Sequence, residues 1–144
     1  MGSTLTHILI DASAAVAWLL PGQKTETSET LLSEASSHTF AAPHLFPAEI
    51  RNALLALEWR GRLTSGETDR AMTALAAYGI AIEPPPDQAD YDAILALARG
   101  ERLTVYDTVY LWDAMRGGYT LASRDGDLLA AAGRNGVEIR DVRR

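Results

Sequence analysis

The fold of this chain is indicated first by the stretch HILIDASAAVAW, residues 7–18. Its first four residues have the aliphatic character of a buried strand, and the alanine-rich part after Asp11 favours a helix. One acid, Asp11, therefore stands where a strand ends and a helix begins. In open parallel sheets with helices on the faces, ligands bind beyond the carboxyl ends of the strands. The sequence places Asp11 at such an edge.

Asp125 is expected in the same kind of position. The segment YTLAS, residues 119–123, has the pattern of a strand, and Asp125 precedes the helical stretch from Leu128 to Ala132. Glu49 and Asp107 instead fall in the first turns of two expected helices, after residues 43–47 and 103–106 respectively. Four carboxylates from distant parts of the chain are thus expected to gather in one pocket.

Short strands alternate with helical segments along the whole chain. Strands are expected at residues 7–10, 39–42, 79–82, 119–122 and 137–140. Strands that alternate with helices are typical of a parallel sheet covered by helices. The sequence therefore predicts an α/β fold with three α/β/α layers and a mainly parallel central sheet.

Local signals place several helices more closely. Apolar residues recur at helical spacing at Tyr91, Ile94, Leu95 and Ala98, which predicts a helix with one apolar face. Thr64 and Glu67 form a capping-box pattern, and Gly79 is expected to end the helix that they begin. Gly117 and Gly118 are expected to end another helix before a strand.

The length and composition predict one domain over residues 1–144, with residues 1–5 as a disordered N-terminus. Cysteine is absent, which excludes disulfides and thiolate metal sites. No basic and apolar leader is apparent, so we expect a cytoplasmic protein. The longest apolar run, Ala12 to Leu20, is much shorter than the roughly 20 residues of a membrane-spanning helix, and no membrane association is expected.

The charge pattern argues against a broad polyanion-binding surface. The net charge is −6, and Lys24 is the only lysine among the 13 basic residues. Arginine binds phosphate through a planar, two-pronged guanidinium group. A local rim of arginines around an acidic, metal-filled centre would reconcile an acidic chain with a nucleic acid substrate.

Oxygen ligands without cysteine favour Mg²⁺ or Mn²⁺ over zinc, and the three histidines have no ligand spacing. Close carboxylates also require cations, because they cannot all stay ionised without them. Two divalent ions about 3.5–4 Å apart could clamp the attacking and leaving oxygens of a phosphodiester.

Each acid also has a purely structural interpretation. Asp11, Asp107 and Asp125 could be helix N-caps. Glu49 could be present only because the helix dipole favours a negative side chain in the first turn. Asp127 could replace Asp125 as the fourth acid, although Asp125 lies nearer the end of the strand. Asp113, six residues beyond Asp107 on one helix, is expected on the solvated surface.

Other hydrolytic chemistries lack their motifs. Asp11-Ala12-Ser13 has no second aspartate of the kind that haloacid-dehalogenase-type phosphatases carry, and the acidic pair and late lysine of response-regulator receivers are missing. There is no Gly-x-Ser-x-Gly elbow and no Walker-type loop. Serine-hydrolase and nucleotide-hydrolase functions therefore have no support.

Five segments together resemble the PIN-domain ribonucleases, and within them the VapC-type toxins of toxin–antitoxin pairs. The resemblance covers about residues 7–142. The most specific segment is residues 42–54, which is similar to the family's Pro-x-x-x-x-x-Glu-x-x-Asn-Ala-Leu pattern. The other matching segments are residues 8–13, 60–64, 106–110 and 121–125.

The resemblance implies a metal-binding and catalytic quartet of Asp11, Glu49, Asp107 and Asp125. It implies that Ser13, Asn52 and Ser123 hydrogen bond around these acids. It also implies Mg²⁺ or Mn²⁺ as cofactor, RNA as substrate and a cognate antitoxin protein as partner, in a homodimer or a toxin–antitoxin hetero-oligomer. The chain departs from the family pattern at Thr108, where alanine is common, and at Asp127, which crowds the fourth acid.

Two surface features would serve substrate and partner. Arginines near the acids could contact RNA phosphates, namely Arg51, Arg116 and Arg124, with Arg60 and Arg62 nearby, whereas Arg143 and Arg144 are expected in a solvated tail. Apolar residues could form a groove for the antitoxin or could be ordinary core, namely Trp18, Leu19, Leu20, Leu55 and Trp59.

The sequence therefore predicts a metal-dependent endoribonuclease that acts as the toxin of a toxin–antitoxin pair. Two alternatives stay open at this point. One is a non-catalytic PIN-fold module that binds RNA or regulates. The other is a metal-dependent phosphatase or DNA nuclease with the same acids.

Overall fold

The computed structural model describes residues 6–144, so the expectation for residues 1–5 lies outside the described residues. The strands are β1 (Thr6–Ile10), β2 (His38–Ala42), β3 (Ala81–Ile82), β4 (Thr120–Ser123) and β5 (Ile139–Asp141). The helices are α1 (Ala12–Leu19), α2 (Glu26–Ser33), α3 (Phe46–Trp59), α4 (Ser65–Ala76), α5 (Gln88–Glu101), α6 (Val105–Gly117) and α7 (Gly126–Arg134). All five expected strands are present, and β3 is shorter than expected.

The five strands form one sheet in the order β3-β2-β1-β4-β5, and every neighbouring pair is parallel. Strand β1 lies in the centre, paired with β2 on one side and with β4 on the other. The chain adds β2 and β3 on one side of β1 and then passes from β3 to β4 on the other side of β1. The direction of strand addition therefore reverses between β1 and β4. The crevice beyond such a reversal point is where open α/β sheets bind ligands.

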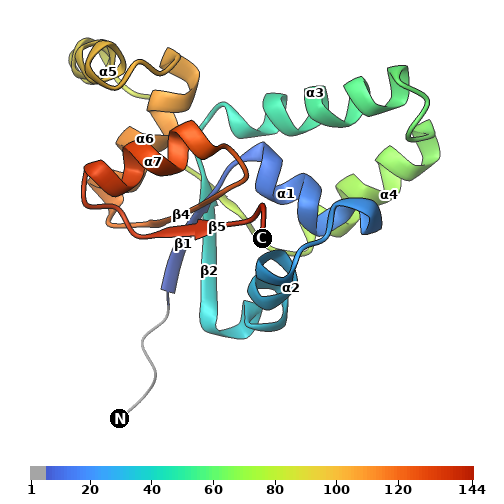
Figure 1. Cartoon of the computed structure of the whole chain (residues 1–144). Helices are drawn as coiled ribbons and strands as arrows, with labels where there is room; N and C mark the ends of the chain where they lie inside the picture. The colour runs from blue at the N-terminus through green and yellow to red at the C-terminus, as the bar shows by residue number, and fades with distance from the viewer. Residues whose placement is uncertain (1–5) are drawn as a thin grey trace.

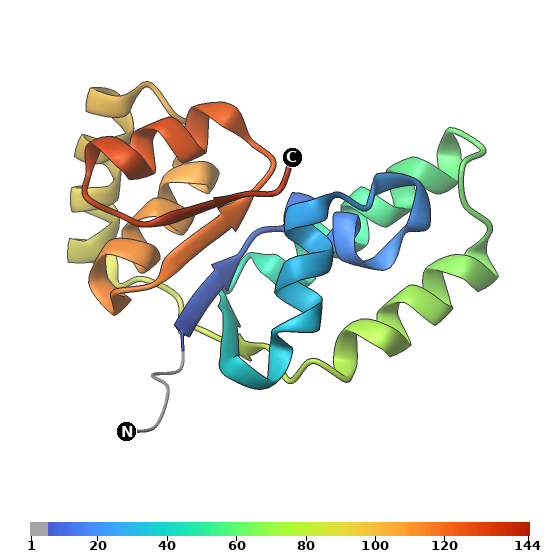
Figure 2. The ribbon, with the colours of Figure 1, turned by 60° about the horizontal axis from the view of Figure 1, so that its bottom comes forward.

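Helices cover both faces of the sheet, so the predicted three-layer α/β/α architecture is confirmed. Figures 1 and 2 show α1 to α4 on one side of the sheet and α6 and α7 on the other. Successive residues of a strand point to opposite faces. Accordingly, Ile8 and Ile10 belong to the core cluster beneath α1 and α3, and Leu9 belongs to the cluster beneath α6 and α7.

The helix ends follow the sequence signals with one difference. Thr64 and Glu67 form the expected capping box, and Gly118 ends α6 with a φ of 65°. Gly79 also has a positive φ, 62°, but α4 already ends at Ala76. Gly79 therefore turns the chain toward β3 and does not itself cap the helix.

The apolar residues expected on two surfaces divide between core and solvent. On α5, Ile94 is fully buried, whereas Leu95 is exposed, so the predicted apolar face of this helix is only half covered. Trp18 is buried, with its ring centroid 4.9 Å from that of Phe40, and therefore belongs to the core. Trp59, in contrast, is 78% exposed at the end of α3. No α-helix within residues 6–144 is long and apolar enough to cross a membrane.

Asp113 is buried, and the prediction that it lies on the solvated surface is wrong. Its Oδ2 atom has no hydrogen-bond partner among the described residues. Burial raises the pKa of Asp113 to about 6, the charges of Glu83 and Asp90 add to the rise, and Arg116 opposes it. The prediction failed because the rotation between Asp107 and Asp113 does not say which side of α6 faces protein. Residues from the loop after β3 and from α5 cover that side.

Asp113 should make stability depend on pH. Between pH 3.8 and about 6 the native state keeps a proton that the unfolded state loses, so the free energy of unfolding falls as pH rises through this window. We expect Asp113→Asn to raise this free energy by about 1–2 kcal/mol at about pH 7.5, after allowance for screening, and to change it little at about pH 4. Urea unfolding at both pH values measures the difference. Asp92→Asn on the exposed side of α5 is the control, and an equal gain at both pH values for Asp113→Asn would contradict the assignment.

Candidate active site

Asp11 is the most tightly held acid of the predicted quartet. It follows β1 directly and caps α1, since its Oδ1 accepts from the backbone N–H of Ala14 at 2.9 Å. The same oxygen accepts from Ser13 Oγ at 2.7 Å, and Oδ2 accepts from the Ser123 hydroxyl. Asp11 is only 8% exposed. It is therefore a helix cap and, at the same time, an acid fixed at the carboxyl end of the central strand.

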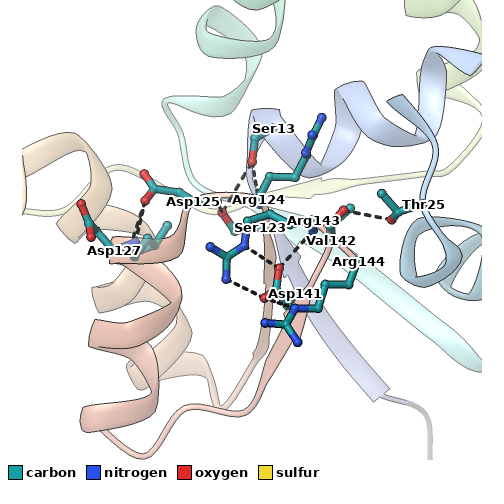
Figure 3. Close-up of polar contacts among 11 residues, drawn as sticks. Ser13, Thr25, Ser123, Arg124, Asp125, Asp127, Asp141, Val142, Arg143 and Arg144 are labelled. Atoms are coloured by element: carbon teal, nitrogen blue, oxygen red, sulfur yellow. Dashed lines mark hydrogen bonds and ion pairs between the residues drawn. The ribbon is translucent and has the colours of Figure 1, made fainter. Parts of the chain in front are cut away.

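The same two serines connect Asp11 to the loop that carries Asp125. The backbone N–H of Arg124 donates to Ser13 Oγ at 2.9 Å, and that of Asp125 donates to Ser123 Oγ at 2.9 Å. Figure 3 shows Ser13 next to Arg124 on this loop and Ser123 at the start of the loop. Each hydroxyl thus accepts from the β4–α7 loop and donates to Asp11. Asn52, in contrast, is exposed on α3, and its side chain forms no hydrogen bond with any residue of 6–144.

Glu49 lies in the first turn of α3, as the sequence indicates, and is half-buried. Its Oε1 atom is buried and has no hydrogen-bond partner within residues 6–144. Burial raises the pKa of Glu49 and the nearby Tyr110 hydroxyl opposes this rise, but that hydroxyl too has no partner in hydrogen-bonding geometry within residues 6–144. A buried acid oxygen left in this way is one that a cation could satisfy.

Asp107 is not a helix cap, which removes that interpretation for this acid. Thr104 caps α6, with its Oγ1 accepting from the Asp107 backbone N–H at 3.1 Å. Asp107 is half-buried within the first turn of the helix. Because the capping role belongs to Thr104, the Asp107 carboxylate has no structural task at the helix end and is available to the pocket.

Asp125 caps α7. Its Oδ1 accepts from the backbone N–H groups of Asp127 and Leu128, at 3.0 and 3.2 Å. Asp127 is exposed within the first turn of the same helix. Figure 3 shows the two aspartates side by side at the end of the loop. Asp125 thus lies on the loop that Ser13 and Ser123 join to Asp11. Asp127 lies two residues later, exposed in the first turn of α7.

The electrostatics link the acids to one another. Burial is the main cause that raises the pKa of Asp11, Glu49 and Asp107. The hydrogen bonds from Ser123 and Ser13 oppose the rise at Asp11, and the charge of Asp125 adds to it. Glu49 is also raised by Asp107 and Asp11, and Asp107 by Asp125 and Asp127. The structure therefore brings together all four predicted acids, with Asp127 at the edge.

Divalent cations fit this group by its chemistry. The donors are carboxylate oxygens, which Mg²⁺ and Mn²⁺ prefer. None of the ion pairs formed within residues 6–144 involves one of the four acids. No three acid or histidine side chains of the described residues are grouped closely enough to hold one ion as they stand. A bound cation would draw the side chains inward and relieve their repulsion.

The arginines expected around the acids have diverse positions. Arg51 is exposed and donates to the Pro47 carbonyl at 2.8 Å. Arg116 lies at the opposite end of α6 from Asp107, where it pairs with Asp90 at 3.3 Å and stacks over Trp112. Arg116 lies nine positions after Asp107 on α6, about 14 Å along the helix axis, so it does not lie beside the four acids. Arg124 donates to Gln23 Oε1 at 2.7 Å.

Arg143 and Arg144 are exposed, as expected, but they are held against the fold and are not a free tail. Val142 is fully buried, and Arg143 forms an ion pair with Asp141 at 2.7 Å. Arg144 approaches the same carboxylate at 3.7 Å. The spacing Asp141-x-Arg143 is a signal that the sequence contained, and the structure places the Arg143 guanidinium against Gly126, at the start of α7. Figure 3 shows this arrangement beside Asp125.

Comparison with known proteins gives one family and several solved structures. The PIN domain matches residues 8–134. The fold is similar to that of PAE2754 from Pyrobaculum aerophilum, with 24% sequence identity, a TM-score of 0.71 and coverage of 97% of this chain and 93% of that chain. No curated protein sequence matches the chain significantly.

Two further structures are similar at lower identity. FitAcB from Neisseria gonorrhoeae is 21% identical, with a TM-score of 0.62 and coverage of 92% of this chain and 95% of that chain. FitAB bound to an IR36 DNA fragment is 19% identical, with a TM-score of 0.64 and coverage of 92% of each chain. The sheet order, the gathered acids and the match over most of the sequence agree: this chain belongs to the PIN domain family, whose members are generally metal-dependent nucleases.

Proposed function

We propose that the chain is a Mg²⁺- or Mn²⁺-dependent endoribonuclease and the toxin of a VapC-type toxin–antitoxin pair. The observation that carries this proposal is the gathering of Asp11, Glu49, Asp107 and Asp125 from four separate segments, with none of them in an ion pair within residues 6–144. A fold that holds such charges together without cations loses stability by doing so. A cation-dependent reaction gives the arrangement a purpose.

The four acids would hold the metal, with Asp11 as the fixed member. When bound, the metal would polarise the phosphodiester and lower the pKa of a water nucleophile. Ser13 and Ser123 keep both oxygens of Asp11 in place, and through the β4–α7 loop they fix Asp125 relative to it. Such a network holds catalytic groups in position, so that little reorganisation is needed during reaction.

RNA is favoured as substrate by the resemblance of the sequence to the VapC-type toxins. An acidic protein with few phosphate contacts should bind a polyanion weakly in general and act selectively. Selectivity would then come from a structured RNA with one unpaired loop, whose bases can be splayed out. The bound DNA fragment in the FitAB structure makes DNA the appropriate comparison substrate, although that DNA is a feature of that complex.

A cognate antitoxin is the proposed partner, in a toxin–antitoxin hetero-oligomer or with a homodimer of the chain. Leu55 and Trp59 are exposed one helical turn apart on α3 and could contact such a partner. Trp18 cannot take part, because it is buried. We place this activity in the cytoplasm, where cellular RNA is present.

Metal binding should stabilise the folded chain. We expect Mn²⁺ to raise the melting temperature of the wild type, because the ion binds the native state preferentially. Asp107→Asn should melt higher than the wild type in EDTA, as like-charge repulsion falls, and should gain less from Mn²⁺. Asp107 is the suitable position because Thr104, and not Asp107, caps α6. Equal Mn²⁺ shifts for the two proteins would contradict a role for Asp107 in metal binding.

Two amide substitutions, Asp125→Asn and Asp127→Asn, can decide which of these two aspartates is the fourth metal ligand. Asparagine also caps helices, so Asp125→Asn should preserve α7 while removing a metal ligand. We expect it to reduce Mg²⁺-dependent cleavage at least about a hundredfold, in line with losses of metal-orienting groups. Asp127→Asn, which removes the same charge nearby, should keep most of the activity. The reverse ranking would make Asp127 the fourth ligand.

The substrate is tested by mapping new RNA ends. Total cellular RNA is incubated with the wild type or with Asp107→Asn, with Mg²⁺ or with EDTA, and single-stranded DNA is treated in parallel. We expect a few new ends in structured RNAs with the wild type and Mg²⁺ only. Degradation of every RNA would defeat the selectivity, cleavage of DNA alone would point to a DNA nuclease, and activity retained in EDTA would defeat the metal mechanism.

A further inference from the structure

A pocket of about 450 Å³ lies between α1, the turn at Pro21–Gln23, the later part of α3 and the β4–α7 loop. Its floor is apolar and includes Val16, Ala53 and Leu57. Its polar groups come from Ser13, Gln23, Arg60 and Arg124, and no acidic residue lines it. On a chain with a net charge of −6, this is a local surface of the opposite sign.

The two arginines of the pocket are free to bind an anion. Within residues 6–144, neither Arg60 nor Arg124 has a carboxylate within 4.0 Å, whereas Arg116, Arg134 and Arg143 are each paired with an acid. Arg124 is also held in place, because one of its terminal N–H groups donates to Gln23 Oε1 at 2.7 Å. The remaining N–H groups of a positioned guanidinium suit the two oxygens of a phosphate.

The pocket adjoins the acidic centre through Ser13. This residue lines the pocket, and its hydroxyl donates to Asp11 at 2.7 Å. Arg124 also borders both regions, since it directly precedes Asp125 and its backbone N–H donates to Ser13. Figure 3 shows the Arg124 side chain leaving the loop next to Ser13, whereas Asp125 points the other way. A strand whose scissile phosphate lay at the acids could therefore continue into the pocket.

We propose that this pocket binds one nucleotide of the substrate strand, next to the phosphodiester that is cleaved. Arg60 and Arg124 contact its phosphate, and its base lies against the apolar floor formed by Val16, Ala53 and Leu57. The choice of a ribonucleotide rests on the proposed ribonuclease function. The pocket itself offers two guanidinium groups and an apolar surface, which suit a phosphate joined to a ring that can lie against that surface.

The test uses uridine 5′-monophosphate as probe and amide NMR of the full chain in EDTA, so that no metal contributes. We expect shifts at Ala53, Ala56 and Arg124. Arg60→Gln and Arg124→Gln should each weaken binding about tenfold, the usual effect of losing a charged hydrogen bond. Arg62→Gln is the matched control, since it removes the same charge two residues from Arg60 but outside the lining. Arg124→Lys should retain part of the binding if the phosphate contact, and not the loop structure, is what matters.

Several results would overturn the proposal. They are the absence of shifts at millimolar probe, an equal loss of binding with Arg62→Gln, and equally tight binding of inorganic phosphate, which would leave no role for the base. On a cleaved RNA, Arg60→Gln should raise KM with little change in kcat, and the opposite split would also count against it. If no RNA is cleaved but the probe still binds, the ribonuclease proposal fails while the pocket stands. If RNA is cleaved and the probe does not bind, only the pocket fails.

Discussion

The structure depends on one buried carboxylate. Asp11 ends the central strand, caps the helix that follows and accepts from three donors, two of them serines on different segments. An ionised group in such a place is costly unless its lone pairs are satisfied. The donors that satisfy it also join the end of β1 to the end of β4. The hydrogen bonds that offset the cost of burying Asp11 therefore also bring the β4–α7 loop, with Asp125, next to Asp11.

The sheet order explains why Glu49 and Asp125 can reach this point. Because β1 lies between β2 and β4, the segments that leave all three strands begin at the same edge of the sheet. Glu49 enters from the helix after β2, and its unpartnered oxygen is in keeping with a group whose natural partner is a cation. Asp113 is a buried acid without a proposed role in metal binding. It is also short of partners, but it lies beside Glu83 and Asp90 and makes the fold depend on protonation.

The sequence was sufficient for the strands and for the positions of Asp11 and Asp125 at strand ends, because each leaves a local signal. Alternation and capping residues mark the elements, and an acid after a parallel strand must lie at the carboxyl edge. It was insufficient where the answer depends on what covers a surface. The angle between Asp107 and Asp113 around α6 follows from the sequence spacing alone. The burial of Asp113 depends instead on residues distant in the sequence, such as Asp90. Likewise, Arg116 is near Asp107 in sequence, but a straight helix carries it away from the pocket.

The distribution of charge also explains how an acidic chain can hold a polyanion. Three arginines are already paired with carboxylates, namely Arg116 with Asp90, Arg134 with Glu101 and Arg143 with Asp141. They contribute little attraction to an approaching phosphate. Arg60 and Arg124 are unpaired within the described residues, and they face a pocket without acids. Other arginines that form no ion pair within residues 6–144, such as Arg51 and Arg62, do not line this pocket. A strand that approaches this acidic chain meets net repulsion, whereas two arginines beside the acids attract its phosphates, which favours the registers that place a phosphate in this pocket.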